Sequence, residues 1–426
     1  MKKIAIFILI VFIPSLVYSE ILIPMDFSQT DHLKAYGVVY MTLEKGYNSK
    51  WLLNYRGGSF LLPSADDLEA LCRLRGVTYE QISPMDYLSI EQTIEKSNMD
   101  IVHLEKAPKI AVYTLPESKA GQLKGFAGEP WDDAVTLALT YAEIPYDTIY
   151  DTEVLQGKLE DYDWLHLHHE DFTGQFGKFY AGFHSTNWYK EIQQIDEELA
   201  HKLGFDKVWQ LKQAVVQMIR EYVRNGGFLF AMCAATDTYD IAQAAYGVDI
   251  CDIPFDGDPM DFQAEQKLDF ERTFAFENFS LVKNPYEYEF SSIDASNYAQ
   301  IRGAEADYFT LFQFSAKYDP VPTMLTQCHV NVVNGFLGQT TSFHKEFVKK
   351  SVIILGEVEG ADEVKYLHGN FGRGTFTFYG GHDPEDYQHR IGDPPTLLEL
   401  HKNSPGYRLI LNNILFPAAK KKKLKT

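Results

Sequence analysis

The chain has 426 residues, with 39 Lys and Arg against 59 Asp and Glu, so its formal net charge at pH 7 is −20. This acidic surplus argues against a nucleic-acid-binding protein and against electrostatic attachment to anionic lipid, since both depend on clustered Lys and Arg. A hydrophobic fraction of 45% and an aromatic fraction of 14% exclude a disordered chain and are enough to build about two or three domains.

Residues 1–19 have the pattern of a signal peptide. Lys2 and Lys3 precede an apolar run over residues 4–17, and Ser19 ends a cleavage site before Glu20. The apolar run is shorter than a membrane-spanning helix requires. We therefore expect an exported protein, periplasmic or secreted, with no membrane span and with its 4 cysteines in an oxidising compartment.

Residues 20–106 are predicted to form a small N-terminal α+β domain. Strands are expected at residues 36–41 and 51–55, on either side of a turn-rich segment. Helices are expected near residues 65–75 and 88–97. This part of the chain contains no group of residues that suggests catalysis.

From residue 107 the pattern changes to alternating strands and helices, which predicts a parallel sheet covered on both faces. The predicted strands are residues 110–114, 146–150 and 163–168 and a buried strand that starts at Gly226 and breaks at Cys233, and the predicted helices are residues 131–144, 153–159, 206–224 and 237–245. The expected fold class is α/β, with a flavodoxin-like, mostly parallel sheet built from residues 107–249 and 351–419. Ligands of such sheets bind beyond the C-terminal ends of the strands.

Residues 250–350 interrupt this alternation with irregular, aromatic and acidic sequence, and we predict that they form an insertion. Regular strands resume afterwards, at residues 352–355, 364–368 and 374–379. Residues 420–426 form a basic tail. This tail is either a solvated terminus or a tether to an acidic surface.

Residues 226–237 predict a buried strand that breaks at Cys233 and restarts as a helix. This is the shape of a nucleophile elbow, in which a sharp turn lifts one side chain out of the sheet at a helix N-terminus. Ala231, Ala234 and Ala235 are small, as a tight turn requires. The same pattern also fits a free cysteine buried at the end of a core strand, and a disulfide at Cys233 would rule out a nucleophile.

His382 follows the last predicted strand and two glycines. Because the carboxyl ends of parallel strands meet at one edge of a sheet, we expect His382 to lie close to Cys233 and to act as its base. Asp383, Glu385 or Asp386 would orient the imidazole. Alternatively, His382 lies in a turn and only makes hydrogen bonds.

Residues 166–174 are dense in imidazole and carboxylate groups and lie at the end of a predicted strand. The side chains expected to line a pocket there are His168, His169 and Glu170. The loop at Gly174 would lend a backbone amide to an oxyanion hole shared with the amide of Ala234.

The same segment also allows a metal site as the alternative interpretation. Closely spaced His and carboxylate groups suit zinc or a similar ion, and the residues that could provide them are His166, His168 and Asp171. The segment has no fixed ligand signature. Our prediction for cofactors is therefore none.

These segments resemble a known family. Residues 109–245 together with 351–417 look like a class I glutamine amidotransferase-like domain, with Cys233 at the elbow and His382 after the late strand. ThuA-like proteins share this general layout. The whole chain resembles an exported family of Bacteroidetes proteins that often carries the label asparagine synthetase B, on the segments 162–171 and 378–387.

The resemblance implies a cysteine-dependent hydrolase that cleaves a small-molecule or peptide-like amide through a Cys233 thioester. It does not imply synthetase chemistry, because the authentic synthetase has an N-terminal cysteine and an ATP-binding loop that this chain lacks. Family members place a glutamate two residues after the histidine, where this chain has Pro384. The alternative is a catalytically silent ligand-binding protein, or an envelope-assembly protein with an envelope protein as its partner.

Overall fold

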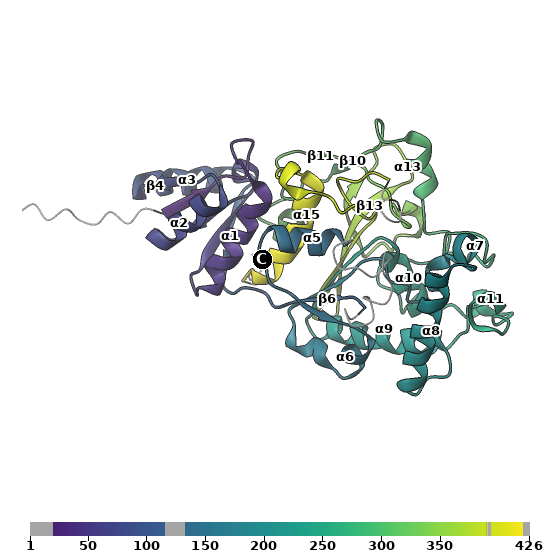
Figure 1. Ribbon diagram of the computed structural model, residues 1–426. Coiled ribbons are helices and arrows are strands. Elements are labelled where there is room, and N and C mark those ends of the chain that lie inside the picture. The colour runs from purple at the N-terminus through teal and green to yellow at the C-terminus, as the bar shows by residue number, and fades with distance from the viewer. Residues whose placement is uncertain (1–19, 116–132, 389, 391–392, 421–426) are drawn as a thin grey trace, which may run out of the picture.

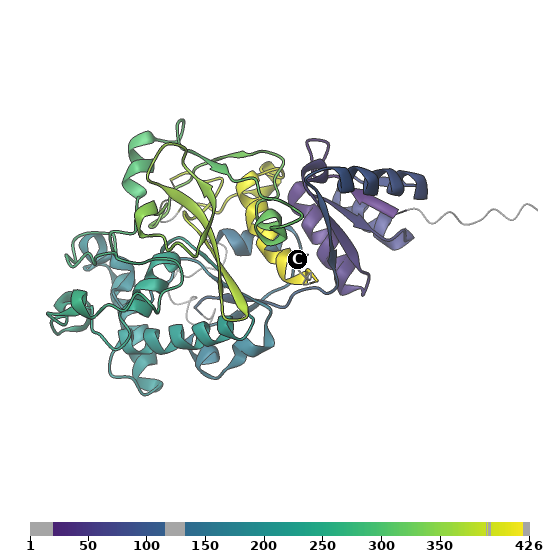
Figure 2. The same cartoon turned by 180° about the vertical axis from the view of Figure 1, so that it is seen from behind.

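The computed structural model describes residues 20–115, 133–388, 390 and 393–420. The predicted signal peptide and residues 421–426 of the basic tail lie outside the described residues. The chain builds two sheets, one of five strands and one of nine strands. Figure 1 shows the N-terminal sheet and its helices at one side of the larger α/β part, and Figure 2 shows the same arrangement from behind.

The N-terminal sheet has the order β4-β1-β3-β2-β5, and all its neighbouring strands pair antiparallel. Its elements are β1 (Glu20–Ile23), α1 (His32–Glu44), β2 (Ser49–Leu53), β3 (Ser59–Leu62), α2 (Asp66–Arg75), β4 (Glu80–Ile82), α3 (Pro84–Lys96) and β5 (Asp100–Leu104). The strand predicted at residues 51–55 and the helices predicted near residues 65–75 and 88–97 are present as β2, α2 and α3.

The prediction of a strand at residues 36–41 is wrong, because these residues form the middle of α1. The local run is rich in Val and Tyr, which favour strands. However, Asp31 caps the helix by accepting a hydrogen bond from the backbone N–H of Lys34 at 2.9 Å. Most of α1 is buried, so its apolar residues surround the helix instead of alternating.

The buried position of α1 depends on Gly37, which lies against the end of α5 (Ala134–Tyr141). A Cβ atom at Gly37 would lie 1.9 Å from the carbonyl oxygen of Ala142. Neither partner in this contact is a flexible side chain. The two helices can therefore approach this closely only with glycine at this position.

Gly37→Ala is expected to lower the free energy of unfolding by about 1–3 kcal/mol, although alanine is the better helix former, because the added methyl group forces α1 and α5 apart. Urea unfolding followed by circular dichroism measures this change. The matched control is Gly182→Ala in α7 (Tyr180–Phe183), where an added Cβ meets open space. Equal stability changes in the two variants would contradict the close approach.

The nine-stranded sheet contains β6 (Ile110–Tyr113), β7 (Asp147–Ile149), β8 (Trp164–Leu167), β9 (Phe228–Met232), β10 (Tyr308–Leu311), β11 (Val332–Asn334), β12 (Ile353–Glu357), β13 (Val364–Phe371) and β14 (Gly374–Tyr379). Its helices are α5, α6 (Asp151–Leu155), α7, α8 (Asn187–Lys202), α9 (Val208–Arg224), α10 (Ala234–Ala244), α11 (Ile253–Asp256), α12 (Ala264–Lys267), α13 (Ser296–Arg302), α14 (Pro320–Leu325) and α15 (Pro405–Leu415).

Among the described residues, the strands of this sheet lie in the order β11-β10-β12-β13-β14-β9-β8-β6-β7. The run from β14 to β7 is parallel, and the run from β11 to β14 is antiparallel. The predicted α/β class is confirmed, but the sheet is mixed and not mostly parallel. The reason is connectivity, because β12, β13 and β14 follow one another through short turns, and short turns join only antiparallel strands.

Helices cover both faces of the parallel half. Side chains alternate along each strand, so that Leu229 and Ala231 face one core while Phe228 and Phe230 face the other. The first core includes residues of α8, α9 and α10, and the second includes residues of α1, α5 and α15. Both views show α1 beside α15 (Figures 1 and 2). No helix in the described part of the chain has the length and apolar character needed to cross a membrane.

Candidate functional site

Cys233 lies between β9 and α10, at the break that the sequence predicts. Its backbone angles are φ 50° and ψ −139°, in the region with positive φ that residues other than glycine rarely adopt. Such backbone strain persists only where the surrounding structure imposes it, and it is concentrated at functional sites. The strand, the turn and the helix therefore have the backbone form of a nucleophile elbow.

The Cys233 sulfur is buried in the described state, with 1% of the residue exposed. It accepts a hydrogen bond from the backbone N–H of Gln339 at 3.3 Å. Burial raises the pKa of the thiol to about 11, and the backbone N–H groups of Thr340, Gln339 and Ala234 offset only part of this effect. The thiol is therefore protonated at neutral pH. All four cysteines are free, so no disulfide rules out a nucleophile.

Residues 337–341 cover the elbow and also contact the backbone at His382. The carbonyl of Leu337 accepts the N–H of His382 at 2.9 Å, and the carbonyl of Thr340 accepts the N–H of Gly381 at 2.8 Å. The Thr340 hydroxyl donates to Asp237 at 2.9 Å. Sequence analysis gave this segment no role. It belongs to the irregular region 250–350, and its pattern gives no signal of this contact.

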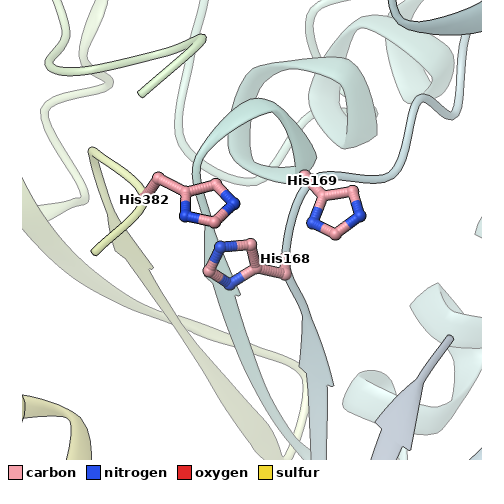
Figure 3. Close-up of side chains that lie close together, drawn as sticks. All are labelled: His168, His169 and His382. Atoms are coloured by element: carbon pink, nitrogen blue, oxygen red, sulfur yellow. The ribbon is translucent and has the colours of Figure 1, made fainter. Parts of the chain in front are cut away.

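His382 lies at the same sheet edge as Cys233, because β14 and β9 are parallel neighbours. Its ring packs on those of His168 and His169, with ring centroids 4.3 Å and 5.8 Å away (Figure 3). Within the described residues, Cys233 makes no hydrogen bond to a histidine ring. Cys233 and His382 therefore follow neighbouring parallel strands at one edge of the sheet, without a hydrogen bond between sulfur and imidazole.

Asp383 and Glu385, the residues expected to orient His382, have other partners. Asp383 accepts hydrogen bonds from the hydroxyl of Tyr407 and from the backbone N–H of Glu385, both at 2.9 Å. The carboxylate of Glu385 lies 2.8 Å from Nδ1 of His401. Within the described part of the chain, the hydrogen bonds of these two carboxylates therefore go to partners other than the His382 ring.

His166 lies on β8 and His168 directly after it, both are buried, and their ring centroids are 5.5 Å apart. His166 Nε2 lies 2.9 Å from a carboxylate oxygen of Asp133, and its Nδ1 lies 3.2 Å from the carbonyl of Phe230. Asp133 also caps α5 by accepting the N–H of Val135. Sequence analysis missed Asp133, whose position before a helix indicates only a cap.

His168 has no hydrogen bond to either ring nitrogen within the described residues. Its Nδ1 lies 3.5 Å from Asp133. Burial holds the pKa of His168 well below its usual value, although the Asp133 carboxylate opposes this shift. His168 is therefore neutral at pH 7 and can act as a base or as a metal ligand.

The loop after β8 is held in place by contacts of three predicted site residues, Glu170, Asp171 and Gly174. Glu170 accepts the backbone N–H of His168 at 2.8 Å, and burial raises the pKa of its carboxyl. Asp171 accepts the N–H of Gly177 at 3.0 Å, and it is not brought together with His166 and His168. Gly174 packs on Trp209, where a Cβ would lie 2.8 Å from the side chain.

A cavity of about 120 Å³ opens beside this loop, at the C-terminal ends of β6 and β8. His169 and Glu170 line it together with Gly174, Phe176 and Lys212. Of the predicted pocket residues, His169, Glu170 and Gly174 line this cavity, whereas His168 and Ala234 are not among its lining residues. The cavity can accept a small ligand next to the His169 ring.

Comparison with known proteins gives no family for this chain. No family model matches it, and no curated protein matches it. Two solved structures, the cytoplasmic proteins STM3548 and STM1381 of Salmonella typhimurium, align with 11% and 12% identity over 74% and 73% of this chain and 100% of their own, each with a TM-score of 0.34.

The GH42 beta-galactosidase Gan42B of G. stearothermophilus aligns at 12% identity over 65% of this chain and 28% of its own length, with a TM-score of 0.28. Similarities this low assign neither a fold family nor an activity.

Proposed function

We propose that the protein is a hydrolase of amide or related acyl bonds, built on a class I glutamine amidotransferase-like domain with Cys233 as its nucleophile. The observation that carries this proposal is the positive φ of Cys233 at the junction of β9 and α10. The strand order is a second support. Numbered along the chain, the five parallel strands lie in the order 2-1-3-4-5, which is the flavodoxin-like order.

In the proposed reaction, the Cys233 thiol gives its proton to the His382 imidazole and the sulfur attacks the carbonyl carbon of an amide. The C–N bond breaks as the leaving amine takes that proton, and water then hydrolyses the thioester. The backbone N–H groups of Ala234, Gln339 and Thr340 stabilise negative charge on the sulfur in the described state, and Ala234, which lies on the elbow itself, is the proposed donor to the developing oxyanion. Residues 337–341 must move before a substrate can reach the sulfur, since Gln339 is bonded to it.

The proposed substrate is a small-molecule or peptide-like amide, since the cavity beside His169 has room only for a small group. We further propose that the N-terminal signal sequence exports the protein to the periplasm or the medium. We also propose that the chain belongs to the exported family that it resembles. We do not propose asparagine synthetase chemistry, although that family often carries this label.

Alkylation by iodoacetamide, followed residue by residue by mass spectrometry, tests the role of Cys233. We expect Cys233 to react faster than Cys72 and Cys251, which are also buried, because opening of residues 337–341 exposes it beside an imidazole. His382→Ala is expected to slow Cys233 at least tenfold, whereas His184→Ala, at an exposed site, leaves the rate unchanged. Equal Cys233 rates in the wild type and His382→Ala would refute the proposal.

A catalytically silent ligand-binding or envelope-assembly protein is the second candidate. It is favoured by the burial of Cys233 and by the raised pKa of its thiol. On this interpretation the cavity at His169 binds a ligand, and Cys233 only completes the core. Iodoacetamide distinguishes the two, because a core thiol would react as slowly as Cys72 in every variant.

A further inference from the structure

Three imidazoles from two chain segments converge at the sheet edge. His168 and His169 follow β8, His382 follows β14, and their rings lie close together (Figure 3). One possible ligand nitrogen from each of the three lies within 4.8 Å of the other two. His168 is also buried without a hydrogen bond on either ring nitrogen in the described part of the chain, although buried polar atoms are normally partnered.

We infer that His168, His169 and His382 form a binding site for a divalent transition-metal ion, for which Zn²⁺ is the best match. Three imidazole ligands suit zinc, copper or nickel, whereas Mg²⁺ and Ca²⁺ require oxygen ligands. Zn–N bonds of about 2.0–2.1 Å in a tetrahedral site place the nitrogens about 3.3 Å apart. The ligand nitrogens, which lie within 4.8 Å of one another, must therefore approach by up to about 1.5 Å, and half-buried His169, on a loop, can make this adjustment.

Asp133 supports this assignment from behind His168. Its carboxylate lies 3.5 Å from His168 Nδ1 and forms a hydrogen bond with His166, which fixes its position. A carboxylate next to one ring nitrogen orients an imidazole and makes its other nitrogen a better ligand. We therefore assign Nε2 of His168 to the metal. The fourth coordination position is left for water or a ligand in the cavity that His169 lines.

Metal bound at this site would change the reactivity of Cys233. This part of the inference rests on the proposed function. A metal ion bound to one nitrogen of the His382 ring leaves the ring proton on the other nitrogen, so the ring can no longer accept the thiol proton of Cys233. Zinc is therefore expected to slow the alkylation of Cys233, and a chelator is expected to restore it. The metal would thus regulate the same site that carries the proposed chemistry.

Equilibrium dialysis of the full chain against Zn²⁺, with metal analysis of the protein, tests the site. The experiment uses Cys233→Ser as its background so that this thiol cannot bind zinc. We expect one zinc ion per chain and at least tenfold weaker binding in His169→Ala, with no change in His184→Ala, which removes an exposed imidazole. Because His169 is only half-buried, its replacement should leave the fold intact, and circular dichroism checks this. Zinc binding that is equal in His169→Ala and the background would overturn the inference.

The two proposals fail in different ways. If zinc binding depends on His169 but alkylation of Cys233 does not depend on His382, the metal site stands and the hydrolase proposal fails. If alkylation depends on His382 while zinc binding is the same in all variants, the metal inference fails alone. The absorption spectrum of the Co²⁺-bound protein, measured in His169→Ala and in His184→Ala, gives a second readout of imidazole ligation. This readout does not require enzymatic activity.

Discussion

Replacing Asp151 by alanine is expected to lower the free energy of unfolding by about 3–5 kcal/mol. Asp151 lies 2.9 Å from the ammonium of Lys212, and both side chains are buried. Burial alone would lower the pKa of Lys212, but the Asp151 carboxylate, Tyr113 and Tyr150 hold it well above its usual value. Lys212 is therefore charged in the folded protein, and Asp151→Ala leaves that charge buried beside the Tyr113 and Tyr150 hydroxyl groups, with only the weaker effect of the Asp196 carboxylate to offset it. Urea unfolding at pH 7 measures the loss.

Two controls separate an uncompensated charge from a simple truncation. Asp151→Leu combined with Lys212→Met is expected to recover most of the stability, because the double variant removes both charges. Asp67→Ala breaks an exposed ion pair with Lys45 and should cost far less stability than Asp151→Ala, because solvent screens this pair. A loss at Asp151 no greater than that at Asp67 would show that Lys212 is not held as a buried cation.

The parallel half of the large sheet could be predicted because its elements are local and regular. β6, β8 and β9 are short apolar runs separated by helical patterns, and such alternation requires crossovers. The antiparallel half could not be predicted in the same way. β10 and β11 lie in irregular sequence, and their pairing depends on contacts with β12, a strand distant in the sequence. The helix α1 was missed because tertiary burial, not local propensity, decides its conformation.

In the candidate site too, the features that local sequence determines could be predicted, and the contacts between distant segments could not. The break at Cys233 was predictable, since one turn between a strand and a helix determines it. The approach of His382 to the same edge followed from strand direction. The cover formed by residues 337–341 and the contact of Asp133 with His166 depend on how distant segments pack. No spacing in the sequence encodes these contacts, so the partners of each imidazole had to come from the structure.

When the pH is lowered from 7.5 to 4, the wild type is expected to lose about 3 kcal/mol more of its free energy of unfolding than His368→Gln loses. His368 is buried on β13, and burial lowers its pKa to about 4, from 6.5 in the unfolded chain. The unfolded chain therefore binds more protons in this range, and the folded state loses stability. The contribution of the neutral ring is complete above pH 6.5 and is lost as the pH falls through 4. The measurement is the unfolding free energy of wild type minus that of His368→Gln, as a function of pH.

Asp294→Asn provides a control of opposite sign. Burial raises the pKa of Asp294 to about 7, so its folded form binds more protons than the unfolded chain does between pH 3.8 and pH 7. This contribution is complete below pH 3.8 and is lost as the pH rises through 7. The difference between wild type and Asp294→Asn should therefore grow in favour of wild type on acidification, whereas the difference for His368→Gln should shrink. Titratable groups that wild type and variant share cancel in each difference of unfolding free energy. If both differences changed in the same direction on acidification, the assigned charge states of His368 and Asp294 would be contradicted.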